Sequence, residues 1–172
     1  MKTKLLIIVL CLSFSITYGQ NSDNVINKTQ KQEFSKNSVG LDGGLLYLGF
    51  GGSINSSVNY ERHIFSLKST SYYLRMGVGY YLIGASDTGY AGVQVPLSLN
   101  LITGKGNNHF ELNLGGRAIF DIKNDEIDYS DEKVRLFPIV NIGYRYQNPK
   151  GGFIFKSLIG IDGITLGIGY AF

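Results

Sequence analysis

Along most of this chain, apolar residues alternate with small or polar residues at a period of two, the pattern of a β-strand with one apolar face. The segment 90–102 shows it most clearly, with apolar positions at Ala91, Val93, Val95, Leu97, Leu99 and Leu101. The segments 72–82, 110–121 and 135–146 alternate in the same way. The last residues do so too, with small residues between Ile164, Leu166, Ile168, Tyr170 and Phe172. The pattern predicts strands and shows no sustained helical period.

Eight strand segments follow one another, each roughly ten residues long, which is the length of a strand that crosses a membrane. The less regular ones are 41–50, 54–64 and 153–161. Several glycines permit a bulge in the first of these, so its register stays open. The pattern predicts an all-β fold, an eight-stranded antiparallel up-and-down barrel formed by residues 38–172.

The distribution of charge separates two kinds of barrel, because a period of two also fits a soluble sandwich or a lipocalin-like barrel. In a soluble barrel the apolar face points inward, whereas in a transmembrane barrel it faces lipid and the polar face lines the interior. Here the polar face carries full charges, and the apolar face runs the whole length of the central strands. Aromatic residues gather near strand ends, as in the girdles of membrane barrels. We therefore expect a transmembrane β-barrel.

Seven charged residues on the polar faces form the candidate site: Glu61, Arg75, Glu111, Arg117, Arg135, Arg145 and Lys156. The interior of an eight-stranded barrel is only wide enough to be filled by side chains. A buried charge without a partner costs several kcal/mol, so these residues have to pair or meet water. The sequence thus predicts a lumenal charge network that plugs the barrel, rather than an open pore.

The N-terminus has the features of a cleaved secretory signal peptide at residues 1–19. Lys2 and Lys4 precede a short apolar run, and small residues precede the expected cut after Gly19. The run is too short for a membrane helix. The polar segment 20–37 is expected to be flexible. The single cysteine, Cys11, lies in the signal peptide, which excludes disulfides from the mature chain.

Charge and hydropathy limit which binding partners and which cellular location we expect. The whole chain has a formal net charge of +3, but cleavage removes two lysines and no acid, so no nucleic-acid partner is expected. No later stretch is long and apolar enough for a membrane helix, so a chain that spans a membrane has to cross it as strands. We expect a monomer in the cell outer membrane of a Gram-negative bacterium, in contact with lipid and lipopolysaccharide.

The even strand number predicts which connections share an end of the barrel. We expect periplasmic turns at 63–69, 103–109 and 147–152, and outward loops at 51–53, 84–89, 122–134 and 162–163. The loop 122–134 is strongly acidic but lacks the residue order of a calcium loop. A merely solvated loop and a weak site for divalent cations both stay open.

Two histidines are the candidates for catalysis. His63 lies near Ser66 and His109 near Glu111, and small barrel enzymes that modify lipid A use a serine, a histidine and an acid. Those enzymes act at the outer leaflet, whereas both histidines fall in expected periplasmic turns. We therefore expect solvated turn histidines and no catalytic residue. The sequence has no HExxH motif, cysteine pair or histidine cluster, so neither a metal nor a cofactor is expected.

Linked motifs add a family resemblance: Val58-Asn-Tyr-Glu-Arg62, Tyr73-Leu-Arg-Met-Gly-Val-Gly-Tyr80, Val95-Pro-Leu-Ser-Leu-Asn100, and Asn141-Ile-Gly-Tyr-Arg-Tyr-Gln147 with Lys150-Gly-Gly-Phe153. Together they resemble a widespread family of uncharacterised outer-membrane β-barrel proteins. The resemblance runs from about residue 58 to 172 and departs at 160–164, where the family tends to have a loop with Pro-Trp. It implies a small eight-stranded outer-membrane barrel and implies no activity.

The function expected from these features is structural, with outer loops available for envelope or surface contact. The strand from Ile164 to Phe172, apolar on one face with a terminal aromatic, is typical of a strand recognised by the outer-membrane assembly machinery. Two alternatives stay open: transport of small solutes or lipids through or along the barrel, and enzymatic modification of lipid A.

Overall fold

In a computed structural model of the protein, the described residues are 35–47, 51–67, 69–85, 89–122 and 134–172. They form eight β-strands and no helix: β1 (Asn37–Tyr47), β2 (Gly51–Leu67), β3 (Thr70–Ala85), β4 (Gly89–Lys105), β5 (Asn108–Asp121), β6 (Val134–Gln147), β7 (Gly152–Gly160) and β8 (Gly163–Ala171). The expected signal peptide 1–19 and residues 20–34 of the expected flexible segment 20–37 lie outside the described residues. The barrel begins at Asn37, one residue before the expected boundary.

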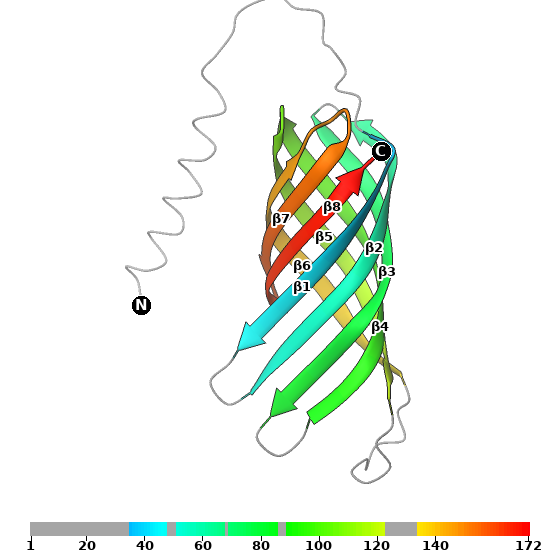
Figure 1. Ribbon diagram of the computed structural model, residues 1–172, viewed down its shortest axis with the longest axis vertical. Coiled ribbons are helices and arrows are strands. Elements are labelled where there is room, and N and C mark those ends of the chain that lie inside the picture. Colours follow the sequence, from blue (N-terminus) through cyan, green and yellow to red (C-terminus); the bar gives the residue numbers. More distant parts are fainter. Residues whose placement is uncertain (1–34, 48–50, 68, 86–88, 123–133) are drawn as a thin grey trace, which may run out of the picture. The chain divides into compact units, whose positions relative to one another are not determined.

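The strands close into one antiparallel barrel in which each strand pairs with its neighbours in sequence, and β1 pairs with β8 (Figure 1). The predicted eight-stranded up-and-down barrel is confirmed. The closing pair runs from Ser38 opposite Ala171 to Leu45 opposite Ile164, which fixes the register of β1 that the sequence left open. Among the described residues, no helix is long and apolar enough to cross a membrane.

The two faces of the barrel wall differ in polarity: the outward positions are mostly apolar, whereas most buried side chains are polar or charged, with apolar exceptions such as Ile139, Ile154 and Leu158. On β6 the outward positions Leu136, Val140 and Ile142 are exposed, and Leu136 exposes 80 % of its surface. The inward positions of the same strand include Asn141 and Arg145, which are buried. On β4 the inward residue Asn100 exposes 0 % of its surface. Alternation in the sequence therefore predicted the two faces, because successive side chains of a strand point to opposite sides.

Strand β2 extends past the expected segment 54–64 at both ends: it begins at Gly51, so the expected outward loop 51–53 is wrong, and it continues to Leu67 beyond a β-bulge. The register with β3 shifts between His63 and Phe65, so that Ile64 is the additional residue of β2. Both Ile64 and Phe65 are exposed, and the alternation resumes at Ser66 after the bulge. Two consecutive apolar residues end a pattern of period two, although the pairing with β3 continues to Leu67.

Some inward positions require glycine because neighbouring strands approach closely. A Cβ atom at Gly79 would lie 1.8 Å from the backbone oxygen of Ser56 on the adjacent strand. A Cβ at Gly143 would lie 2.2 Å from the backbone oxygen of Ser157. These contacts are far shorter than any van der Waals separation, so a larger residue would force the strands apart.

Candidate functional site

Six charged side chains meet inside the barrel and form its central ion network. They come from six different strands: Asp42 of β1, Glu61 of β2, Arg75 of β3, Glu111 of β5, Arg145 of β6 and Lys156 of β7. Each side chain is almost completely buried. Because the three acids balance the three bases, the network carries no net formal charge.

Glu61 has the largest number of partners in this network. Its Oε2 accepts hydrogen bonds from Arg145 Nη2 at 2.7 Å and from Ser38 Oγ at 3.0 Å. Its Oε1 accepts from Lys156 Nζ at 2.9 Å and from Asn100 Nδ2 at 3.1 Å. A carboxylate has about four lone-pair positions, so the acceptor capacity of Glu61 is filled by the protein itself.

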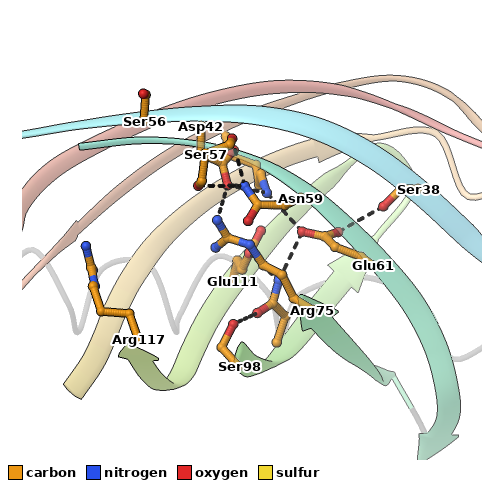
Figure 2. A network of polar contacts seen from close by, with 12 residues as sticks. Ser38, Asp42, Ser56, Ser57, Asn59, Glu61, Arg75, Ser98, Glu111 and Arg117 are labelled. Atoms are coloured by element: carbon orange, nitrogen blue, oxygen red, sulfur yellow. Dashed lines mark hydrogen bonds and ion pairs between the residues drawn. The ribbon is translucent and has the colours of Figure 1, made fainter. Parts of the chain in front are cut away.

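Asp42 holds the other side of the network. Its Oδ2 accepts from Arg75 Nη2, from Lys156 Nζ at 3.3 Å and from Asn59 Nδ2 at 3.1 Å. Lys156 therefore joins the carboxylates of Asp42 and Glu61. Figure 2 shows Asp42, Asn59 and Arg75 close together, with Glu61 beside them.

Arg145 is the most enclosed residue of the network. Its side chain has an exposed fraction of 0 %, and its Nη1 donates to Glu111 Oε2 at 3.2 Å. Its Nε donates to Gln147 Oε1 at 2.7 Å, and its guanidinium carbon lies 5.8 Å from the centre of the Tyr73 ring. Hydrogen bonds and the face of an aromatic ring thus surround the charge in a region that excludes water.

The remaining two predicted residues form separate pairs. Arg117 contacts Asp162 through Nη2 and donates to Gln94 Oε1 at 3.1 Å through Nη1. Arg135 Nε donates to Asp121 Oδ2 at 3.2 Å, and this pair is only partly buried. In Figure 2, Arg117 lies apart from the central cluster. The seven predicted residues therefore occupy three groups rather than one network, because their strands place them at different heights in the barrel.

Sequence reasoning missed two acids that complete these groups. Asp42 was hidden by the open register of β1, although it lies on the small-residue face opposite Leu41 and Leu45. Asp162 was placed in a short outward turn, yet its surface is only 7 % exposed because its side chain turns inward to Arg117. Burial raises the pKa of the Asp162 carboxyl above its ordinary value, while the charge of Arg117 opposes that rise.

The expectation of solvated turn histidines is wrong for both residues. Strands β4 and β5 continue to a two-residue turn at 106–107, so His109 is an inward residue of β5 with 3 % exposure. Its Nε2 lies 3.0 Å from the backbone oxygen of Gln147. His63 is half-buried in β2 and packs edge-on against the Tyr73 ring, with 5.2 Å between ring centres.

The bulge in β2 brings Ser66 into contact with His63, and Ser71 in turn contacts Ser66. Residues three apart on a regular strand point to opposite faces, but the additional residue Ile64 turns Ser66 to the side of His63. His63 Nε2 lies 2.8 Å from Ser66 Oγ, which lies 2.9 Å from Ser71 Oγ on β3. The sequence placed His63 near Ser66 but could not show that their side chains touch.

No protein-family model matches the chain, and no curated protein matches it. Within the described residues, no group of three or more histidine, cysteine or acidic side chains is arranged to hold a metal ion. The contacts that the site does show are ion pairs between oppositely charged side chains, which join strands across the interior of the barrel.

Proposed function

We propose that this protein is a small integral outer-membrane β-barrel with a structural role, whose interior is closed by the central ion network. The observation that carries the proposal is the inverted polarity of the wall. Apolar side chains such as Leu136, Ile159 and Ile164 are exposed on the outside, while Glu61 and Arg145 are buried inside. This is the polarity of a transmembrane barrel.

The outer surface of this barrel is more apolar than the surface of a soluble monomeric protein. Exposed apolar side chains occur outward on all eight strands, including Leu41, Val58, Val78, Leu97 and Leu114. Soluble monomers rarely expose continuous apolar patches of more than a few hundred Å². A soluble barrel that holds an apolar ligand would also need a mainly apolar interior, and here most of the buried side chains are polar or charged.

Aromatic side chains add a band near the end of the barrel where β1 begins and β8 ends. The exposed or half-exposed members of this girdle are Tyr60, Phe65, Tyr72, Phe110, Tyr144, Tyr146, Phe153, Tyr170 and Phe172. Toward the opposite end, Tyr80 and Phe120 are exposed. Aromatic girdles of this kind lie at the headgroup level of a bilayer, so they support a barrel that crosses the membrane.

The structural role follows from the closed interior and the closed sheet. The ion network joins strands on opposite sides of the barrel, which favours a plug over a route for solutes. Because the sheet has no free edge, it needs no second copy to cover one, so we propose a monomer. The expected signal peptide, the resemblance to outer-membrane barrels and the strand from Ile164 to Phe172 support the outer membrane as its location, with lipopolysaccharide and the assembly machinery as proposed partners.

Heat-modifiability tests this proposal. The outer-membrane fraction of cells that make the protein is run on a denaturing gel, with and without boiling. We expect the protein in that fraction, with a mobility that shifts on boiling because a closed membrane barrel resists detergent until heated. A protein found in the soluble periplasmic fraction without a shift would overturn the proposal and favour a soluble barrel.

One contact favours a second candidate function, hydrolysis of an acyl ester in a membrane lipid. Ser66 Oγ lies 2.8 Å from His63 Nε2, the contact that a serine nucleophile makes with its general base. A fluorophosphonate probe tests this candidate on the detergent-solubilised protein. Labelling that Ser66→Ala abolishes and Ser71→Ala leaves would support it; an unlabelled wild-type protein would exclude Ser66 as an activated nucleophile.

A further inference from the structure

Among the described residues, the charged side chains that are fully exposed are all positive and lie at one end of the barrel. The five described acids, Asp42, Glu61, Glu111, Asp121 and Asp162, all take part in ion pairs, of which only the pair of Asp121 is partly exposed. Five of the nine described lysines and arginines neutralise them. The other four are exposed and make no ion pair among the described residues: Lys36, Arg62, Lys105 and Lys150.

These four residues, the basic collar, are distributed around the rim where β1 begins and β8 ends. Lys36 precedes β1, and its backbone oxygen accepts a hydrogen bond from His63 N at 2.8 Å, which places it next to Arg62 on β2. Lys105 ends β4, and Lys150 lies in the connection from β6 to β7. The sequence between β5 and β6 at 123–133, which lies outside the described residues, has five acids and two lysines.

The aromatic girdle places this collar at the depth of lipid headgroups. Tyr60 and Arg62 are both exposed on β2, with Arg62 nearer the rim. The Tyr60 hydroxyl donates to Asn37 Oδ1 at 2.6 Å, and the Tyr144 hydroxyl donates to Asn108 Oδ1 at 2.7 Å. Both phenol groups thus direct their polar ends toward the rim and leave their rings on the apolar wall. That orientation marks the boundary between hydrocarbon and headgroups.

We infer that the basic collar binds anionic phospholipid headgroups in the membrane leaflet at this end of the barrel. The inference rests on the proposed membrane location. Lysine and arginine next to a headgroup layer attract phosphate groups, and the attraction falls off within a Debye length. The other described charged side chains pair with one another, so the collar holds the fully exposed charged side chains that the described barrel wall presents to this leaflet. A headgroup with net negative charge fits the collar better than a zwitterionic one.

The test measures which lipid stays with the barrel. Purified protein is inserted into vesicles of mixed phosphatidylglycerol and phosphatidylcholine, extracted with mild detergent and examined by native mass spectrometry. We expect a several-fold excess of bound phosphatidylglycerol, which added salt reduces. The variant with Lys36→Gln, Arg62→Gln, Lys105→Gln and Lys150→Gln should lose that excess. The matched variant with Lys36→Arg, Lys105→Arg and Lys150→Arg should keep it, because the charge is unchanged.

Insertion is scored separately by heat-modifiability in vesicles of phosphatidylcholine alone. A wild-type barrel that inserts but retains phosphatidylglycerol and phosphatidylcholine equally would overturn the inference that the collar binds anionic lipid, and it would leave the proposed function intact. A glutamine variant that inserts and keeps the excess also overturns the collar. A wild-type protein that inserts into neither kind of vesicle overturns the proposed function and the collar together. If the fourfold variant fails to fold, Lys105→Gln and Lys150→Gln alone must each lower the excess, and an unchanged excess in both overturns the collar.

Discussion

Arg145 and Glu61 are 84 positions apart in sequence, yet Arg145 Nη2 lies 2.7 Å from Glu61 Oε2. Their strands, β6 and β2, are not neighbours in the sheet, so the ion pair crosses the interior. It therefore fixes two opposite parts of the wall relative to each other, a constraint that backbone pairing between adjacent strands does not supply. Both side chains are buried, so water screens their attraction very little.

Replacement of Glu61 should strongly destabilise the barrel. Glu61→Gln keeps the shape of the side chain but leaves the buried charges of Arg145 and Lys156 without one of their acids. Loss of one partner of a buried ion pair lowers the free energy of unfolding by about 3 to 5 kcal/mol. Urea titration of the protein in lipid vesicles, followed by loss of the unboiled gel mobility, measures the change.

Two matched variants test whether this loss comes from the central network. Glu111→Gln should lower the free energy of unfolding less than Glu61→Gln does, because Arg145 still pairs with Glu61. Glu111→Gln should nevertheless lower the heat resistance of the barrel on a gel. Asp121→Asn should lower the free energy of unfolding by less than about 1 kcal/mol, since its partner Arg135 is partly exposed. Equal losses in all three variants would contradict a special role for the buried network.

The same side chains should keep the barrel from conducting ions. Wild-type protein in a planar bilayer should show no steady conductance, because the network fills the interior. Arg145→Ala removes the side chain that crosses the interior and leaves Glu61 and Glu111 behind. This variant should give small conductance steps that favour cations over anions. Steady conductance by the wild-type protein would contradict a closed interior.

Much of this architecture could be predicted from the sequence, because alternation determines which face a strand residue occupies. Arg75, Glu111 and Arg145 were expected inside, and they are buried. The pairing of these charges could not be predicted in the same way. Contacts across the interior depend on the stagger and tilt of strands that are distant in sequence, as between β2 and β6.

Local irregularities explain the other differences between expectation and structure. Asp42 was missed because the glycines around it obscure the period of β1, and Asp162 because turn residues are normally solvated. The bulge at Ile64 ended the alternation in β2 and concealed that His63 and Ser66 share a face. In none of these cases does the hydrophobic pattern alone show which way the side chain points.

Gly79 should be intolerant of even a single methyl group. A Cβ at this position would meet the backbone oxygen of Ser56, so Gly79→Ala has to separate β2 from β3. We expect a loss of about 1 to 3 kcal/mol in the free energy of unfolding, measured by urea titration in vesicles. Gly84→Ala is the control on the same strand, since a Cβ there has nothing within 4 Å and should be tolerated. Equal behaviour of the two variants would contradict the close approach.

Phe172 should matter for assembly rather than for stability. Its backbone exchanges two hydrogen bonds with Asn37, of 3.0 and 2.8 Å, while its side chain is 60 % exposed. Phe172→Ala keeps both backbone bonds, so purified protein should refold into vesicles with an unchanged urea midpoint. In cells the same variant should reach the outer membrane at a reduced level if the assembly machinery recognises the terminal aromatic. Normal levels in the membrane would argue against that recognition.

Asp162 should make the stability of the barrel depend on pH in a definite direction. Burial raises the pKa of its carboxyl in the folded protein above the ordinary value of 3.8, and Arg117 only partly opposes this. Just above that pH, the folded state binds more protons than the unfolded state, so stability falls as the pH rises through the folded pKa. Asp162→Asn cannot ionise and should not show this fall. Urea midpoints of both proteins in vesicles, compared across this pH range, should therefore separate as the pH rises, with the wild type losing stability relative to the variant. A wild type that instead gains stability relative to Asp162→Asn would mean that the attraction of Arg117 for the carboxylate outweighs its burial.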